Sequence, residues 1–277
     1  MISIEFFPPR TEKASSSLLE KAQQLSQTLS PEFFSVTFGA GGSTQENTLN
    51  TVVELQKLTK VPTAAHISCI NTSQEVISSL LNKYIEKGIN RLVVLRGDLP
   101  SGMGKYRNDG FTHASHLVEY IRRTTADHFH ISVAAYPEYH PDSKSPKSDI
   151  QHFIEKAKCG ADQAITQYFF NADAYFYFVD KVRKAGVDIP IIPGIMPITN
   201  SQGLMKFSSM CGAEIPRWIK LNLEKFGEDT ESIKSFGLDV VANLCQTLID
   251  NDAPKPHFYS LNQSNPVIDI VNSLNFK

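Results

Sequence analysis

The sequence alternates between short apolar stretches and longer amphipathic stretches along its 277 residues. The stretch 91–95 is continuously apolar after Arg91, which is typical of a strand buried on both faces of a parallel sheet. The amphipathic stretches carry apolar residues at helical spacing, as Leu18, Ala22 and Leu25 do. We therefore expect eight strand-then-helix units, with strands at 1–6, 33–37, 62–67, 91–95, 130–135, 163–168, 190–195 and 256–261.

An eightfold strand–helix alternation predicts the α/β class. A (β/α)8 barrel (TIM barrel) has about 250 residues, and no linker rich in Pro or Ser divides this chain. We therefore predict a single barrel domain over residues 1–277, with extra helices between 213 and 253, before the last strand. A doubly wound open sheet is the alternative.

The composition is that of an ordinary globular protein. Twenty-seven Lys and Arg stand against 29 Asp and Glu, without a run of one sign, which argues against nucleic-acid and anionic membrane surfaces. No apolar run approaches the roughly 18 residues of a membrane span, and the first residues lack a signal-peptide pattern, so we expect a cytoplasmic protein. The widely spaced cysteines predict reduced, mostly buried thiols at Cys69, Cys159, Cys211 and Cys245.

Polar side chains stand where the predicted strands end. In barrels of this kind the active site forms at the C-terminal ends of the strands. We therefore expect an acid, an amide, hydroxyls and imidazoles to converge on one mouth. The residues at these ends are Glu5, Thr37, His66, Asp98, Tyr136, Glu138, His140, Gln167 and Tyr259.

Glu5 is the first of these residues, between apolar neighbours and the stiff Pro8-Pro9 turn. Such surroundings disfavour the charged form of a carboxyl group and raise its pKa. A carboxylic acid that holds its proton near neutral pH can act as a general acid. The alternative is a structural ion pair between Glu5 and Arg10.

Two other kinds of site have weaker support. His66, Asp98, Glu138 and His140 carry possible metal ligands, but without a His-x-His or i, i+4 pair, and we predict no metal site. The glycine-rich stretch 39–42 precedes a predicted helix, where anions can bind. It lacks the spacing of a dinucleotide or P-loop fingerprint, which favours a simple turn.

Six motifs, in order along nearly the whole chain, resemble those of the methylenetetrahydrofolate reductase family. They are 5–10 (EFFPPR), 35–40 (SVTFGA), 95–100 (LRGDLP), 132–138 (SVAAYPE), 164–170 (AITQYFF) and 192–197 (IPGIMP). The resemblance implies the catalytic barrel of a bacterial-type flavoprotein oxidoreductase in one-carbon metabolism and methionine supply. Such an enzyme reduces 5,10-methylenetetrahydrofolate to 5-methyltetrahydrofolate, with ping-pong hydride transfer from NADH through FAD.

The resemblance further implies a homo-oligomer with small-molecule substrates and no nucleic-acid or membrane partner. It does not separate NADH from NADPH. The alternatives are a flavin-free methylenetetrahydrofolate reductase, another flavin-dependent imine reductase on the same barrel, and a non-catalytic relative that binds folate or a partner subunit.

The resemblance also assigns roles by position. Glu5 would protonate the substrate and Asp98 would place a negative charge near the flavin. FAD would contact Thr37, His66, Arg96, Gly97, Asp98, Ala114, Tyr136, His140, Asp149 and Lys156. Folate would contact Gln167, Phe207 and Gln263. The chain departs from the family pattern at the adenine end, with His113, His152 and Glu155, and on the folate side, with Gly203 for Gln and Gln263 for Arg.

Overall fold

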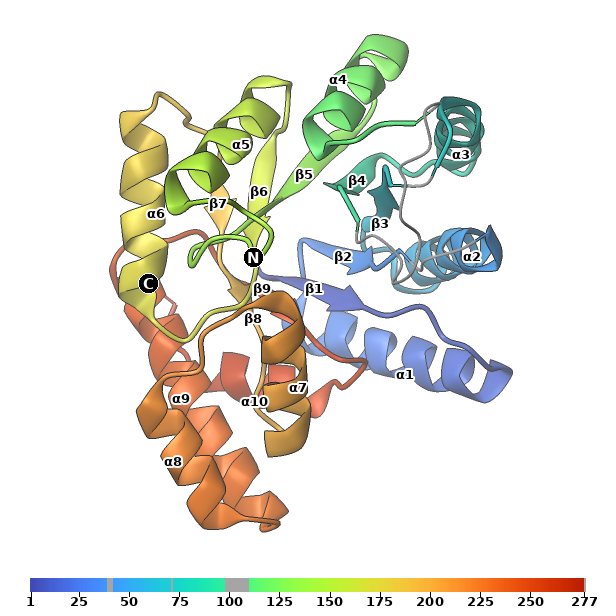
Figure 1. Ribbon diagram of the computed structural model, residues 1–277. Helices are drawn as coiled ribbons and strands as arrows, with labels where there is room; N and C mark the ends of the chain where they lie inside the picture. The colour runs from blue at the N-terminus through green and yellow to red at the C-terminus, as the bar shows by residue number, and fades with distance from the viewer. Residues whose placement is uncertain (39–41, 71, 98–109, 277) are drawn as a thin grey trace.

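The computed structural model describes residues 1–38, 42–70, 72–97 and 110–276. In this part of the chain nine short strands form one sheet in the order β7-β6-β5-β4-β3-β2-β1-β9-β8, and every pairing is parallel. Because β7 and β8 follow each other in sequence but lie at opposite ends of this order, the sheet curls into a nearly closed barrel (Figure 1). The predicted α/β barrel is therefore confirmed.

Strands lie at seven of the eight predicted places. β4 and β5 have the predicted bounds, β3 is shifted by one residue, and the other four are shorter than predicted. The seven are β1 (Ser3–Phe6), β2 (Phe33–Val36), β3 (Thr63–Ser68), β4 (Arg91–Leu95), β5 (His130–Ala135), β6 (Gln163–Thr166) and β9 (His257–Tyr259).

The single strand predicted at 190–195 is wrong, because Pro193 divides it into β7 (Ile191–Ile192) and β8 (Gly194–Ile195). Proline has no N–H to continue a ladder. β7 pairs with β6, and β8 pairs with β9. At the change of partner, Gly194 donates to Thr166 Oγ1 at 2.8 Å, and a Cβ on Gly194 would lie 2.0 Å from the Thr166 carbonyl oxygen. The barrel thus closes at a position that has no room for a side chain.

Ten helices are described. Figure 1 shows α1 to α6 around the strands, while α7, α8 and α9 extend below them. α8 and α9 are the extra helices expected between 213 and 253, before the last strand, whereas α7 follows the seventh predicted strand. The bounds are α1 (Glu12–Leu29), α2 (Gly42–Thr59), α3 (Gln74–Glu86), α4 (Ala114–Thr125), α5 (Pro146–Lys158), α6 (Ala172–Lys184), α7 (Ser201–Cys211), α8 (Arg217–Phe226), α9 (Thr230–Asp250) and α10 (Asn265–Asn272).

Local capping explains where several helices begin. Asn171 caps α6, since its side chain accepts from Asp173 N. Ser73 caps α3. The side chain of Ser73 accepts from Val76 N, which satisfies one of the free N–H groups of the first turn.

The barrel interior holds a small apolar cluster beneath the strand ends. Phe33, Ala64, Val93, Ile165 and Ile192 form it, one from each of five strands. Because side chains alternate along a strand, the residues two positions further on point to the same interior. In β2 and β3 these residues are polar. A polar layer therefore lies between the apolar cluster and the C-terminal ends of these strands.

Two further expectations concern the whole chain. The cysteines are free thiols; Cys69 and Cys245 are buried, while Cys159 and Cys211 are half-buried. In the described ranges we find no helix with the length and apolar character needed to cross a membrane.

Candidate functional site

A cavity of about 500 Å³ opens at the C-terminal ends of the strands. It gathers side chains from β1, β3 and β9, from the loops after β2, β5 and β6, and from α7. The predicted site residues that line it are Glu5, Thr37, His66, Tyr136, His140, Gln167 and Phe207, together with the strand-end Tyr259. The strand-end pattern therefore does bring these groups together. Asp98 lies outside the described residues.

Glu5 lies at the centre of a buried polar cluster. Its Oε2 is 3.1 Å from His66 Nε2 and 3.6 Å from His257 Nε2. Ser35 Oγ donates to the same oxygen at 3.4 Å. His66 Nε2 is at ion-pair distance but has no partner with hydrogen-bond geometry among the residues described. All of these contacts meet at one carboxylate oxygen.

The predicted rise in the pKa of Glu5 is wrong. Burial alone would raise this pKa, but the electrostatic attraction of the neighbouring His66 and His257 imidazoles outweighs burial and lowers it to about 2. Arg10 is exposed at the surface, and the charge partners of Glu5 are imidazoles instead. Glu5 is thus an ionised carboxylate in this structure at neutral pH.

His257 is a site residue that the strand-end pattern missed. It is fully buried, and its Nδ1 lies 2.7 Å from Ser3 Oγ. Ser3 pairs in register with His257, and Glu5 with Tyr259. Its position could have been inferred from the sequence. His257 stands two residues before Tyr259, so the two side chains lie on the same face of the strand.

Beside the cavity, the segment after β4 carries a cation. Arg96 donates to Asp142 Oδ2 at 2.6 Å, and Asp142 lines the cavity. Burial and the nearby Arg96 charge lower the pKa of His140, whose ring packs edge-on against Tyr136 at 4.6 Å. Gly97 has φ +84°, and a Cβ there would lie 2.1 Å from Ser68 Oγ, so only glycine fits.

A second cation, the half-buried Lys156 of α5, lies beside β5. Lys156 donates from Nζ to the carbonyl oxygen of Ala134 at 2.5 Å. Burial lowers the pKa of Lys156 to about 8, although Asp149 opposes the shift. Asp149 is buried and accepts from Ser143 Oγ at 2.7 Å. Ala114 begins α4 and is also buried.

The expected folate contacts divide into two groups. Gln167 and the half-exposed Phe207 both line the cavity. The Gln167 Oε1 accepts from Tyr168 N at 3.0 Å, which leaves its NH₂ group to face a ligand. Gln263 is exposed and stands outside the lining of this cavity, with its backbone N–H bonded to the Ser260 carbonyl at 2.9 Å.

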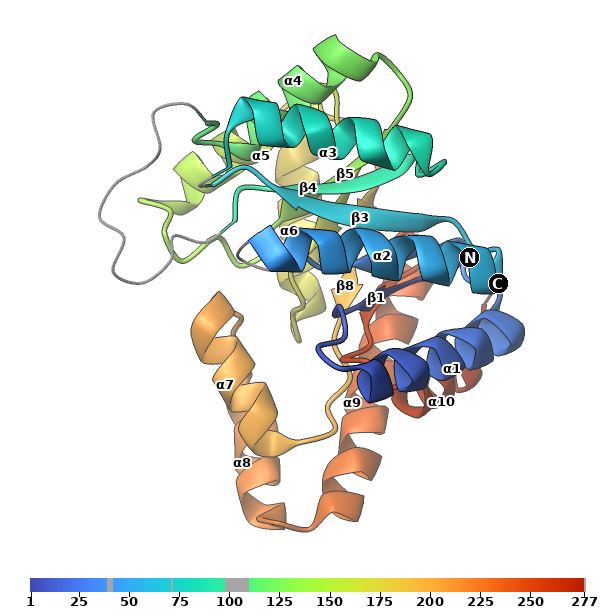
Figure 2. The ribbon, with the colours of Figure 1, turned by 90° about the vertical axis from the view of Figure 1, so that its right-hand side faces the viewer.

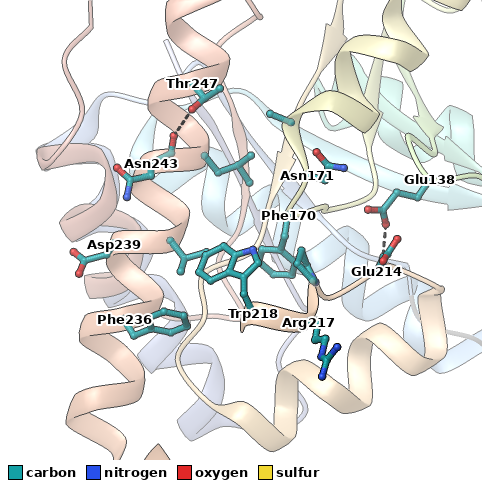
Figure 3. Close-up of a pocket in the computed structure, with 14 residues that line it drawn as sticks. Glu138, Phe170, Asn171, Glu214, Arg217, Trp218, Phe236, Asp239, Asn243 and Thr247 are labelled. Atoms are coloured by element: carbon teal, nitrogen blue, oxygen red, sulfur yellow. Dashed lines mark hydrogen bonds between the residues drawn. The ribbon is translucent and has the colours of Figure 1, made fainter. Parts of the chain in front are cut away.

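Glu138 is separate from the strand-end cavity. It lines a larger cavity of about 740 Å³ between the loop after β6 and helices α8 and α9. Figure 3 shows its carboxylate turned toward Glu214, whose N–H donates to Glu138 Oε2 at 2.7 Å. Trp218 lies in the middle of this view, between the carboxylates and Phe236. Glu138 therefore does not face the same space as His140, with which it was grouped as a possible metal ligand.

Three comparisons place the chain among known proteins. The 5,10-methylenetetrahydrofolate reductase of Buchnera aphidicola (from Schizaphis graminum) is 40% identical over 268 residues, covering 97% of this chain and 89% of that protein. The enzyme of the same name from Escherichia coli is 36% identical over 273 residues, covering 99% and 90%.

A solved structure of an uncharacterized protein from Clostridium thermocellum, described as binding two copies of 5-methyl-5,6,7,8-tetrahydrofolic acid, has the same fold. It superposes with a TM-score of 0.65 at 16% identity, covering 99% of this chain and 93% of that one. The methylenetetrahydrofolate reductase family model matches residues 1–275. This chain therefore belongs to the methylenetetrahydrofolate reductase family.

Proposed function

We propose that this protein reduces 5,10-methylenetetrahydrofolate to 5-methyltetrahydrofolate with NADH, using FAD, and that residues 1–277 act as one catalytic barrel. The observation that carries the proposal is the convergence of Glu5, His66 and Gln167 on one cavity at the strand ends. In barrels of this fold that face is where active sites form. Membership of the family supplies the reaction.

The residues beside the cavity fit an anionic, hydrogen-bonding cofactor such as FAD. His66 Nε2 is buried without a hydrogen-bond partner in the described part of the chain, and a ligand could satisfy it. Lys156 and Arg96 would hold the diphosphate, and Thr37, Tyr136 and His140 would contact the flavin. A buried lysine whose pKa is lowered by desolvation regains stabilisation when an anion binds beside it. When bound, FAD supplies the hydride relay between the nicotinamide and the folate.

Glu5 supplies the proton that opens the five-membered ring of the substrate. The departing nitrogen must be protonated before the resulting iminium carbon can accept hydride. Because the side-chain contacts of Glu5 with the described residues meet at Oε2, we assign Oε1 as the oxygen that addresses the substrate. Since the carboxyl group of Glu5 is ionised at neutral pH, a proton must first reach it before it can pass to the substrate nitrogen.

The remaining roles concern substrate position. Gln167 would bind the pterin through its amide, and Phe207 would pack against the bound ring. Asp98 would stabilise the cationic iminium by its charge, a role that rests on the sequence motif. We also propose that the protein assembles as a homo-oligomer, as the family resemblance implies.

Two measurements on the purified protein test the proposal. We expect a yellow protein that releases FAD on denaturation, whose flavin is bleached by NADH under anaerobic conditions and restored by methylenetetrahydrofolate. A colourless protein that still reduces methylenetetrahydrofolate would indicate a flavin-free reductase. A flavin that NADH bleaches but the folate cannot reoxidise would indicate a different imine reductase.

A further inference from the structure

Helix α7 brings Phe207 to the strand-end cavity. Phe207, Met210 and Cys211 line that cavity at i, i+3 and i+4, so one face of the helix forms its wall. Figure 2 shows α7 on the side of the molecule where β3 and β4 end, apart from the helices that surround the strands. The position of this wall therefore depends on what holds α7.

Two α7 side chains are buried, Leu204 and Ser208. Leu204 joins the apolar core. Ser208 buries a hydroxyl group, which needs a hydrogen-bond partner to offset the loss of its contacts with water. That partner is Tyr168, whose hydroxyl lies 2.9 Å from Ser208 Oγ. The Cys211 thiol donates to the same Tyr168 oxygen at 3.3 Å.

One hydroxyl from the loop after β6 thus bonds two successive turns of α7. The end of the helix is tight as well, because a Cβ on Gly212 would lie 2.5 Å from Pro141 Cγ. Tyr168 also follows Gln167 directly, and its N–H bonds the Gln167 side chain at 3.0 Å. The two proposed folate contacts, Gln167 and Phe207, are therefore linked through Tyr168.

We propose that Tyr168 is a positioning residue that fixes α7, and through it Phe207, against the substrate in the strand-end cavity. The inference rests on the proposed function for its substrate, the aromatic pterin of methylenetetrahydrofolate. An aromatic wall that is already fixed before binding loses less conformational freedom when the ligand arrives. The Tyr168 hydroxyl raises affinity for the folate by this means, without touching the reacting atoms.

A double-mutant cycle tests whether Tyr168 acts through Phe207. We expect Tyr168→Phe to raise the KM for methylenetetrahydrofolate about fivefold with kcat within about twofold, since one hydrogen-bonded anchor is lost. In the Phe207→Ala background the same change should alter KM by less than about 1.5-fold, because the side chain being positioned is gone.

Tyr175→Phe is the matched control. Its hydroxyl is also buried and donates to the Ile191 carbonyl at 2.7 Å, but in the core behind β7, so KM should stay unchanged. An equal effect of Tyr168→Phe in both backgrounds would mean that Tyr168 contacts the substrate on its own. An unchanged KM in the active Tyr168→Phe protein would likewise overturn the proposal.

Hydrogen exchange gives a readout that needs no turnover. The amides of residues 201–211 should exchange several-fold faster in Tyr168→Phe than in wild type or in Tyr175→Phe. If the wild-type protein fails to reduce methylenetetrahydrofolate, the proposed function is wrong, and the exchange result alone decides whether Tyr168 anchors α7. Unchanged exchange over 201–211 would show that it does not.

Discussion

The two cavities of this barrel differ in size, chemistry and place. The larger, about 740 Å³, lies beside α8 and α9, and its Glu138 carboxylate accepts a hydrogen bond from the Glu214 backbone N–H. The smaller, about 500 Å³, collects groups from the strand ends and pairs Glu5 with two imidazoles. Volume alone would select the larger cavity, whereas the meeting of unlike polar groups at the strand ends favours the smaller one as the proposed active site.

The pKa values of the buried Glu5 and the half-buried Glu138 are also shifted in opposite directions. Burial and the nearby Glu214 charge raise the pKa of Glu138, although the Glu214 N–H partly offsets them. The imidazoles lower that of Glu5 to about 2 despite its burial. A raised pKa is a common mark of a catalytic acid, and here it marks the residue outside the strand-end cavity. The location of a carboxyl group and the residues around it therefore carry more information about its function than the direction of its pKa shift.

The largest expected effect separates these two acids. Glu5→Gln should lower steady-state reduction of methylenetetrahydrofolate by about 10²–10⁴-fold, the usual contribution of a general acid. Glu138→Gln, the matched control in the larger cavity, should change the rate by less than about twofold, since it faces no substrate. A large loss in Glu138→Gln, with Glu5→Gln near wild type, would reverse the comparison.

The acid dependence of stability sharpens the contrast. The folded-state pKa of Glu5 lies below its unfolded value of about 4.5. Its stabilisation is therefore present above pH 5 and is lost as the pH falls toward 2, by up to about 3 kcal/mol. Urea unfolding at pH 6 and pH 3 should show a smaller loss in Glu5→Gln than in wild type.

Glu138 should show the opposite sign. Its folded-state pKa is raised, so its ionisation costs stability as the pH rises through that value. Glu138→Gln should therefore gain unfolding free energy relative to wild type on going from pH 3 to pH 6. The same sign in both variants would contradict the charge arrangement described for the two cavities.

A smaller effect concerns the cation behind β5. Lys156→Met should weaken FAD binding about tenfold, the loss of one charge-assisted contact. In wild type the affinity should also fall above pH 8, because Lys156, with its pKa lowered to about 8, loses its charge there.

Lys158→Met, on the exposed side of the same helix, is the control for Lys156. Its FAD affinity and pH profile should match wild type in a fluorescence titration of the apoprotein. Equal effects of the two substitutions would mean that general surface charge, and not the buried amine, attracts the cofactor.

The sequence was sufficient to predict most of the fold. Alternating apolar and amphipathic stretches are local signals, and they located the strands and the extra helices. The division at Pro193 was missed because the stretch 190–195 is apolar throughout, and the change of pairing partner depends on barrel closure. The proline itself was the available warning, since it cannot continue a ladder.

The sequence predicted which residues line the strand-end cavity better than it predicted their pKa values. Strand ends gave Glu5, His66 and Gln167 because all parallel strands end on one face. The pKa of Glu5 was mispredicted because its neighbours in the chain are apolar, while His66 and His257 come from distant strands. Glu138 was misplaced for a related reason, since a loop residue after a strand end can turn to either side of the barrel wall.

We propose that folate is reduced in the cavity that contains Glu5, with a proton supplied through that residue. Anaerobic stopped-flow absorbance of Glu5→Gln, mixed first with NADH and then with methylenetetrahydrofolate, tests this role of Glu5. We expect flavin bleaching by NADH at a rate within about threefold of wild type, and reoxidation by the folate slowed at least about 100-fold. Reoxidation at the wild-type rate would show that Glu5 does not supply the proton.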